Sequence, residues 1–309
     1  MSANRFPPPG ELVDIGGRRL HYFSAGAGSP TVVFESGGGG GSSIQDLPVM
    51  RLVSAFTRAI VYDRAGLGWS DPAPPGRTFL DRAGDLHILL KLAQAPPPYV
   101  LVGASFGGLL TRAYARRYPD EVVGMVLVDA AEEGKYFPTM ARMRAALEQM
   151  LIVEARRAES GELRRNLEPR LQRARWFNED EKLWALGVVS RASHFQAALE
   201  ELTAIDGTPP EMTKAGGFGS LGDRPLIVLS RDQPLTGDMA PWEDGADLAQ
   251  RRLASLSSNS RHVIATGLGH SIAVESPPLV AASVAAVLQA AAGNTLDTTE
   301  VQRIAAAGR

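Results

Sequence analysis

One serine in a sharp turn constrains this chain more than any other feature of its sequence. Residues 99–102 are apolar and predict a short buried strand, and residues 108–115 predict a helix. Between them, residues 103–107 read G-A-S-F-G, a G-x-S-x-G pattern in the strand–turn–helix context that it requires. The two glycines permit a tight turn because a side chain at either position would meet neighbouring backbone. The pattern therefore predicts that Ser105 projects from the carboxyl end of a buried strand.

Short apolar runs alternate with helical patterns along the rest of the chain. Strands are expected at 12–15, 18–23, 31–34, 59–63, 122–129, 225–230 and 262–265, and helices at about 78–94, 245–257 and 277–292. Such apolar strands, alternating with helices, predict an α/β fold with a mostly parallel, doubly wound sheet covered on both faces. The last residues, 293–309, show no clear packing partner.

The strand pattern is interrupted between about 135 and 206, where apolar residues recur at helical spacing. This interruption predicts an all-helical cap inserted after the strand that ends at Asp129. The expected division is a core in two parts, 1–134 and 221–309, with a helical cap or lid at 135–220.

Composition excludes several classes of function. The 309 residues carry a formal net charge of −2 and no basic stripe, so a nucleic-acid partner is not expected. The chain has no cysteine, which excludes disulfides and cysteine nucleophiles. No apolar run is long enough to span a bilayer, and the first residues lack the apolar stretch of a secretory signal, so the prediction is a cytoplasmic protein. No metal-binding motif is present, and neither a metal nor another cofactor is expected.

Four segments in this order resemble the α/β-hydrolase fold superfamily, and in particular its serine hydrolases that carry a lid. They are Ser36-Gly37-Gly38, the run Y-D-R-A-G-L-G-W-S at 62–70, the G-x-S-x-G pattern, and G-L-G-H at 267–270. The resemblance covers almost the whole chain. It implies that Ser105 is a nucleophile, that His270 is its general base, and that an aspartate orients His270.

Two aspartates are candidates for the residue that orients His270. Asp232 follows the strand at 225–230, which is the usual place for the acid in this superfamily, although the turn Ser230-Arg231-Asp232 is shorter than the family pattern. Asp129 ends the strand after Ser105, a position that members resembling haloalkane dehalogenases use. Both choices keep the chain order Ser…Asp…His. Asp232 is preferred here, and Asp129 is the alternative.

Acyl transfer also needs hydrogen-bond donors for the oxyanion that forms in the transition state. The turn supplies the N–H of Phe106, and the glycine run at 37–41 is expected to supply a second N–H from Gly38 or Gly39. A phosphate-binding loop is the competing interpretation of this run, but no G-K-[ST] follows it. Trp69 is a candidate for lining the substrate pocket.

These observations predict a cofactor-independent serine hydrolase that cleaves small-molecule carboxylic esters with a sizeable apolar group. The same triad also serves carbon–carbon bond hydrolysis, proline-iminopeptidase-like action and perhydrolysis, and a ligand-binding receptor on this fold is an alternative of a different class. Serine in place of aspartate at position 105 argues against haloalkane dehalogenase and epoxide hydrolase chemistry. The sequence does not indicate whether the protein is a monomer or an oligomer.

Overall fold

The computed structural model describes residues 7–308, which fold around a single eight-stranded sheet. The strands are β1 (Glu11–Asp14), β2 (Arg19–Ala25), β3 (Thr31–Glu35), β4 (Ala59–Tyr62), β5 (Tyr99–Ala104), β6 (Val122–Val128), β7 (Leu226–Arg231) and β8 (Ser260–Ala265). Their order across the sheet is β1-β2-β4-β3-β5-β6-β7-β8. β2 runs antiparallel to both of its neighbours, and β3 to β8 are parallel, which confirms the predicted mostly parallel sheet.

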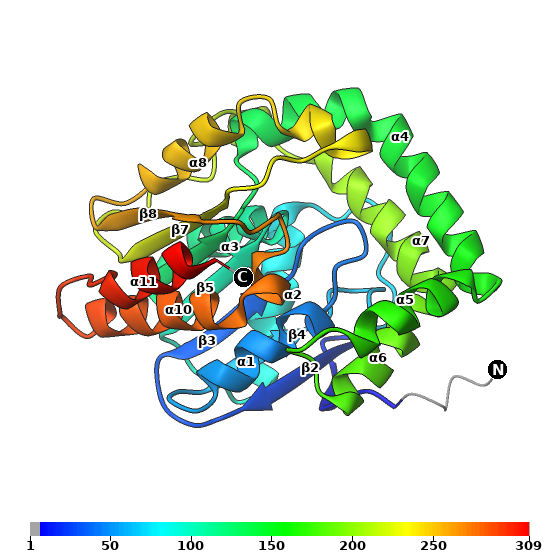
Figure 1. The fold of residues 1–309 in the computed structure, drawn as a ribbon, viewed down its shortest axis with the longest axis horizontal. Coiled ribbons are helices and arrows are strands. Elements are labelled where there is room, and N and C mark those ends of the chain that lie inside the picture. Colours follow the sequence, from blue (N-terminus) through cyan, green and yellow to red (C-terminus); the bar gives the residue numbers. More distant parts are fainter. Residues whose placement is uncertain (1–6, 309) are drawn as a thin grey trace.

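Helices cover both faces of this sheet (Figure 1). The core helices are α1 (Leu47–Val53), α2 (Phe79–Leu92), α3 (Gly107–Arg117), α8 (Ala246–Ala254), α9 (Ile272–Glu275), α10 (Pro277–Ala291) and α11 (Thr299–Ala307). Alternate residues of a strand point to opposite faces. Val33 of β3 accordingly belongs to the apolar cluster with α2, α3 and α8, whereas Val32 belongs to the cluster with α1, α10 and α11.

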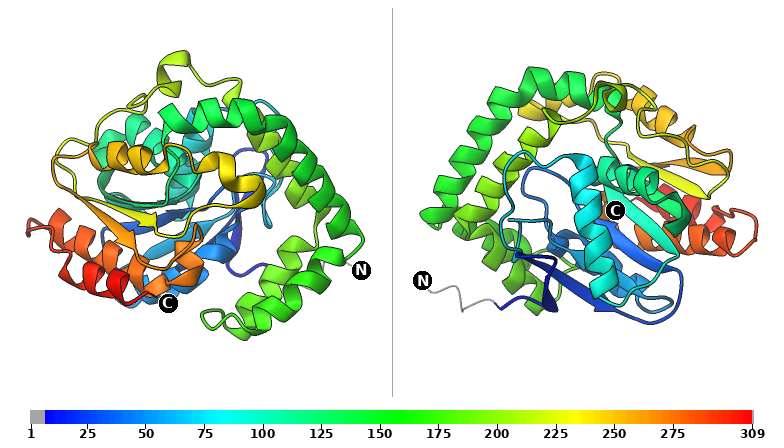
Figure 2. Two further views of the ribbon diagram at one scale, coloured as in Figure 1. Left: turned by 45° about the horizontal axis from the view of Figure 1, so that its top comes forward. Right: turned by 180° about the vertical axis from the view of Figure 1, so that it is seen from behind.

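The predicted helical cap follows β6. It contains α4 (Glu133–Glu159), α5 (Glu162–Gln172), α6 (Glu179–Val189) and α7 (Ala192–Glu201). α4 and α7 pack against each other, and the four helices form one group beside the sheet (Figure 2). The first of these helices, α4, begins at Glu133, because the Glu132 side chain accepts a hydrogen bond from the N–H of Lys135 and so caps the helix. The division of the chain at 134/135 and 220/221 stays a prediction.

The carboxyl-terminal segment corrects one expectation. Residues 299–307 form α11, which packs against α10 and β8, with Val301 and Ala305 buried. The Thr266 N–H donates to the carbonyl of Ala305. The interpretation that 293–309 lacks a packing partner was therefore wrong for this helix. Its apolar residues are too few for the pattern to stand out without the neighbouring elements.

Candidate active site

The turn between β5 and α3 holds Ser105 in the left-handed region, at φ +50°. Strain of this kind requires surrounding structure that fixes the backbone. The Ser105 N–H donates to the carbonyl of Val128, and the Ser105 carbonyl accepts from the N–H groups of Gly108 and Ala131. A Cβ on Gly107 would lie 2.0 Å from the carbonyl oxygen of Glu35. The turn geometry therefore requires glycine here, as the sequence pattern predicts.

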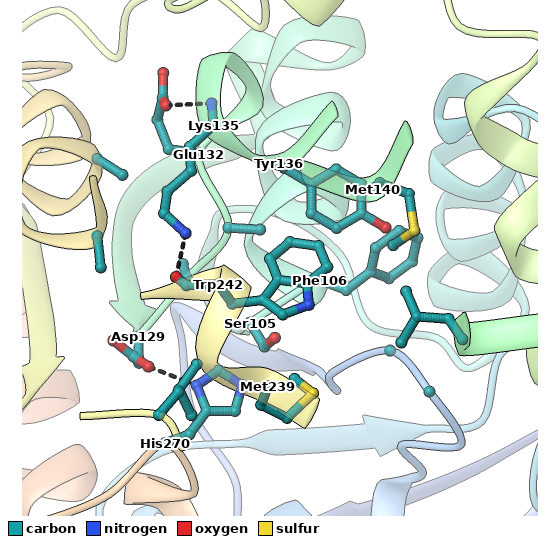
Figure 3. Close-up of a pocket in the computed structure, with 18 of the residues that line it drawn as sticks. Ser105, Phe106, Asp129, Glu132, Lys135, Tyr136, Met140, Met239, Trp242 and His270 are labelled. Atoms are coloured by element: carbon teal, nitrogen blue, oxygen red, sulfur yellow. Dashed lines mark hydrogen bonds and ion pairs between the residues drawn. The ribbon is translucent and has the colours of Figure 1, made fainter. Parts of the chain in front are cut away.

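His270 and Asp129 meet at the same sheet edge. Nδ1 of His270 lies 2.5 Å from Oδ2 of Asp129, which is almost completely buried at 3 % exposure. His270 follows β8, whereas Asp129 follows β6 at φ +41°. His270, Asp129 and Ser105 all line one cavity, where Figure 3 shows their side chains. The structure thus gathers a hydroxyl, an imidazole and a carboxylate in one cavity, with the imidazole in contact with the carboxylate.

The two candidate aspartates have different partners in the structure. Asp232 is exposed, and its Oδ2 accepts a hydrogen bond of 2.8 Å from the N–H of Gly267. It therefore ties the turn after β7 to the loop that leads to His270. The short turn places Arg231, not Asp232, beside the carboxylate that contacts the imidazole. Asp129, the alternative candidate, is the aspartate that contacts the imidazole.

Arg231 is the neighbour that sequence analysis missed. Its guanidinium contacts Oδ2 of Asp129 at 2.6 Å and a carboxylate oxygen of Glu243 at 2.6 Å. Burial alone would raise the pKa of Asp129, but the hydrogen bond and charge of His270, together with Arg231, outweigh it and hold that pKa below its ordinary value. Asp129 is thus ionised at neutral pH. No sequence motif indicates Arg231, because its contact with Asp129 depends on the ends of β6 and β7 lying side by side.

The loop that carries Gly38 and Gly39 lies opposite Phe106. Gly38 packs closely on Phe106, because a Cβ on Gly38 would lie 3.1 Å from the Phe106 Cβ. Both glycines and Phe106 line the cavity with Ser105. The residues chosen as oxyanion donors are therefore gathered around the serine, although which N–H groups hold the oxyanion stays a prediction.

A buried ion network supports this glycine loop. Arg64 donates to the carbonyls of Ser36 and Gly37, both at 2.8 Å. Its guanidinium pairs with Glu35 at 3.0 Å and with Glu201 of the cap at 2.6 Å. All three charged side chains are less than 5 % exposed, so the pairing is needed to keep the charges ionised away from water. Glu201 consequently joins the cap to the loop beside Ser105.

A cap histidine makes a second connection to the same loop. The Gly68 N–H donates to Nδ1 of His194, at 2.9 Å, and Nε2 of His194 lies 2.8 Å from the carbonyl of Gly40. Because Nδ1 accepts a hydrogen bond, the proton must be on Nε2. Burial lowers the pKa of His194, which favours this neutral form. His194 is therefore a structural residue of the cap contact.

The remaining three histidines have structural partners. His21 is fully buried against Asp63 at 2.8 Å, and His262 lies 2.6 Å from the hydroxyl of Ser230. His87 lies on α2 and pairs with Glu121 at 3.2 Å. His270 alone among the five histidines lines the cavity that contains Ser105.

The cavity has a volume of about 310 Å³ and a mainly apolar wall. The apolar side chains come from the cap and from residues 235–249, and they include Tyr136, Met140, Leu147, Met150, Leu151, Leu202, Leu235, Met239 and Trp242. Trp69 is not among the lining residues. Its ring is buried against His21 and Arg191 instead, so the expectation that Trp69 lines the pocket is wrong.

Within residues 7–308, no group of three or more histidine, aspartate or glutamate side chains is placed to hold a metal ion. No helix in the same range is both long enough and apolar enough to cross a membrane.

Comparison with known proteins agrees with this geometry. Residues 32–283 match the model of the alpha/beta hydrolase family. A cis-3-alkyl-4-alkyloxetan-2-one decarboxylase of Shewanella oneidensis is 32% identical over 119 residues, which cover 37% of this chain and 36% of that protein. A probable transporter, efuK, of Hormonema carpetanum is 37% identical over 134 residues, which cover 40% of this chain and 19% of that protein. The matched part therefore spans well under half the length of both relatives.

The enol-lactonase of Burkholderia xenovorans LB400 has a similar structure, with a TM-score of 0.62 and 20% identity. The match covers 90% of this chain and 100% of the lactonase. At this identity the likeness shows the fold alone. The family match, by contrast, covers most of the chain, and the sheet order and strained serine turn fit it. The chain belongs to the alpha/beta hydrolase family.

Proposed function

We propose that this protein is a serine hydrolase that cleaves carboxylic esters with a sizeable apolar group through an acyl-enzyme. The contact between His270 and Asp129, in the cavity that also contains Ser105, is the observation that carries the proposal. A serine hydroxyl is a weak nucleophile at neutral pH and needs an oriented base. The imidazole, held through Nδ1 by a buried carboxylate, is such a base.

The reaction proceeds in two halves. Ser105 attacks the ester carbonyl while Nε2 of His270 takes its proton, and the imidazolium then protonates the leaving alcohol. Water, deprotonated by His270, attacks the acyl-enzyme and returns the serine. Asp129 keeps the Nδ1 proton in place and stabilises the imidazolium. The N–H groups of Phe106 and of Gly38 or Gly39 hold the oxyanion in both halves.

The cavity wall favours an apolar acyl or alcohol group. Most of the surface around Ser105 is contributed by aliphatic, methionine and aromatic side chains of the cap and of residues 235–249. Burying apolar substrate surface there releases about 25 cal/mol for each Å² removed from water. Esters with longer apolar groups are therefore expected to have larger kcat/KM values than acetates.

An aminopeptidase needs a free carboxylate in the cavity to receive a substrate amino group. Glu201 is neutralised by Arg64 and Arg82 and is not free. One oxygen of Glu132 accepts the Lys135 N–H and lies 3.7 Å from Arg252, but its Oε1 is buried without a hydrogen-bond partner among the described residues, so aminopeptidase action stays an alternative. Carbon–carbon hydrolysis and perhydrolysis would use the same triad, and a substrate panel separates them from esterase activity.

The test combines labelling with turnover. A fluorophosphonate should label the parent protein at Ser105 alone, and 4-nitrophenyl esters from acetate to octanoate should be hydrolysed. Ser105→Ala should remove both labelling and turnover, while the matched surface variant Ser258→Ala retains them, since Ser258 is exposed. Labelling at another residue, or turnover by a folded Ser105→Ala protein, would contradict the proposal. Binding without turnover would favour a receptor.

A further inference from the structure

We propose that Arg231 is a positioning residue that weakens the hold of Asp129 on the protonated form of His270, and that Glu243 moderates this effect. The inference rests on the proposed function, because it concerns how the base of that reaction is set. It identifies a residue that the triad pattern does not contain.

One carboxylate oxygen of Asp129 contacts both the imidazole of His270 and the guanidinium of Arg231. Oδ2 of Asp129 lies 2.5 Å from Nδ1 of His270 and 2.6 Å from a guanidinium nitrogen of Arg231. The backbone N–H of Arg231 also approaches Oδ1 of Asp129, at 3.4 Å. The Arg231 side chain is 9 % exposed and that of Asp129 is 1 % exposed, so water screens their interaction poorly.

A carboxylate shared in this way holds an imidazolium less firmly. In the usual triad the full charge of the aspartate stabilises the protonated imidazole. Here the guanidinium contacts the same Oδ2 as the imidazole, so it offsets part of that charge and repels a second positive charge on the imidazole. Asp129 therefore pairs less strongly with the protonated imidazole than an unshared carboxylate would.

Glu243 opposes this effect from the far side of Arg231. Its carboxylate contacts the guanidinium at 2.6 Å, and the same oxygen accepts the N–H of Leu235 at 2.9 Å. The Glu243 side chain is 42 % exposed, so its influence on His270 is weaker than that of Arg231.

Other charged groups around this cluster come from three segments. Lys135 of α4 interacts electrostatically with Arg231, Glu243 and Asp129. It also interacts with Asp244, which follows the short helix Gly237–Trp242. Glu275 of α9 accepts a hydrogen bond from the N–H of Gly269, next to His270. These groups are unchanged in the variants below, so a difference between variants reports on Arg231 and Glu243.

The two residues also fix the wall of the cavity. Residues 232–245 connect β7 to α8 and include Met239 and Trp242, which lie near Ser105 and His270 in Figure 3. Arg231 joins the start of this segment to its end through Glu243. The experiment therefore separates an electrostatic role of Arg231 from a purely structural one.

The experiment compares pH profiles of kcat/KM for a neutral 4-nitrophenyl ester. Arg231→Met removes the charge, and the acid limb should move to higher pH by about one unit, as expected for a unit charge that shares a carboxylate oxygen with the imidazole in a partly buried site. Arg231→Lys keeps the charge, and its acid limb should stay near that of the parent. Glu243→Gln removes the opposing charge, and its limb should move to lower pH by a few tenths of a unit.

A second measurement is independent of turnover. NMR titration of the His270 ring in the Ser105→Ala background should show the same order of midpoints: Arg231→Met highest and Glu243→Gln lowest. Arg251→Met is the matched control, because Arg251 is an exposed arginine of α8 paired with Asp247. It should leave both measurements unchanged.

A folded Arg231→Met protein with reduced kcat and an unmoved midpoint would overturn the inference and assign Arg231 a structural role. A shift of equal sign in Arg231→Met and Glu243→Gln would also overturn it. If the midpoints shift as expected but the parent hydrolyses no ester, the proposed function fails while the electrostatic coupling stands.

Discussion

Replacing Asp129 by asparagine is the perturbation that most directly tests the site. The amide cannot accept the Nδ1 proton of His270 as a carboxylate does, so the imidazole adopts the wrong tautomer and loses stabilisation of its charged form. In a well-studied serine protease triad this change costs about 10⁴ in kcat, which corresponds to about 5 kcal/mol of transition-state stabilisation. We expect a loss of that order in Asp129→Asn.

The structure adds a second effect of the same substitution. Asp129 is the buried partner of Arg231, and removing one partner of a buried ion pair costs about 3–5 kcal/mol of stability. Arg231 keeps Glu243 as a partner, so the lower end of that range is expected. The Asp129→Asn variant should therefore be folded at 25 °C but should unfold at lower temperature than the parent. Circular dichroism checks this before kinetics are measured.

Asp232→Asn is the matched control. Asp232 is exposed, its carboxylate accepts a hydrogen bond from the Gly267 N–H, and an asparagine oxygen can accept the same bond. Its kcat should stay within about threefold of the parent value, since the expected loss is below 1 kcal/mol. A folded Asp129→Asn protein with near-parent kcat, beside an inactive Asp232→Asn protein, would refute the assignment of the acid.

Three further predictions follow from charge and burial. Ester turnover should fall on the acid side with a midpoint between about pH 5.5 and 7.5, and EDTA should leave it unchanged; inhibition by EDTA would indicate a metal. Glu201→Gln should lower stability at pH 7 by about 3 kcal/mol, because it leaves Arg64 with less compensation in a buried site. Burial tends to raise the pKa of Glu201, but Arg64 and Arg82 hold that pKa below its ordinary value. The stabilisation by ionised Glu201 is therefore fully present above the unfolded-state pKa and is lost as pH falls through the folded-state pKa. The difference in melting temperature between variant and parent should accordingly shrink over that range. Burial raises the pKa of Asp46 to about 7, so the folded state loses stability relative to the unfolded state as pH rises from about 4 to 7. Asp46→Asn should therefore stabilise the protein at pH 8 but not at pH 4. An equal effect of the substitution at both pH values would refute the raised pKa.

Local sequence determined the framework of this protein. The apolar runs identify the strands, because parallel strands buried on both faces exclude polar side chains. The pattern around Ser105 identifies the serine turn, because only glycine fits where the backbone of Glu35 approaches Gly107. The loop after the last strand identifies His270 as the candidate general base. Each of these features depends on a residue and its immediate neighbours along the chain.

Tertiary structure decided which carboxylate meets His270. Asp129 and Asp232 both follow strands that end at the same sheet edge, and the sequence favours Asp232 by its position. The choice depends on the direction of two side chains: at φ +41° Asp129 faces the imidazole, whereas the short turn after β7 directs Asp232 toward Gly267. Direction of this kind is set by packing across β6, β7 and β8, which no local pattern records.

The same reason explains what sequence analysis missed. Arg231 contacts Asp129 from 102 residues away, and Glu201 reaches Arg64 from 137 residues away. Charged residues are frequent at surfaces, so their presence in the sequence does not indicate burial. Only the folded chain brings these partners together and excludes water from them, and that exclusion is what gives their charges influence over the site.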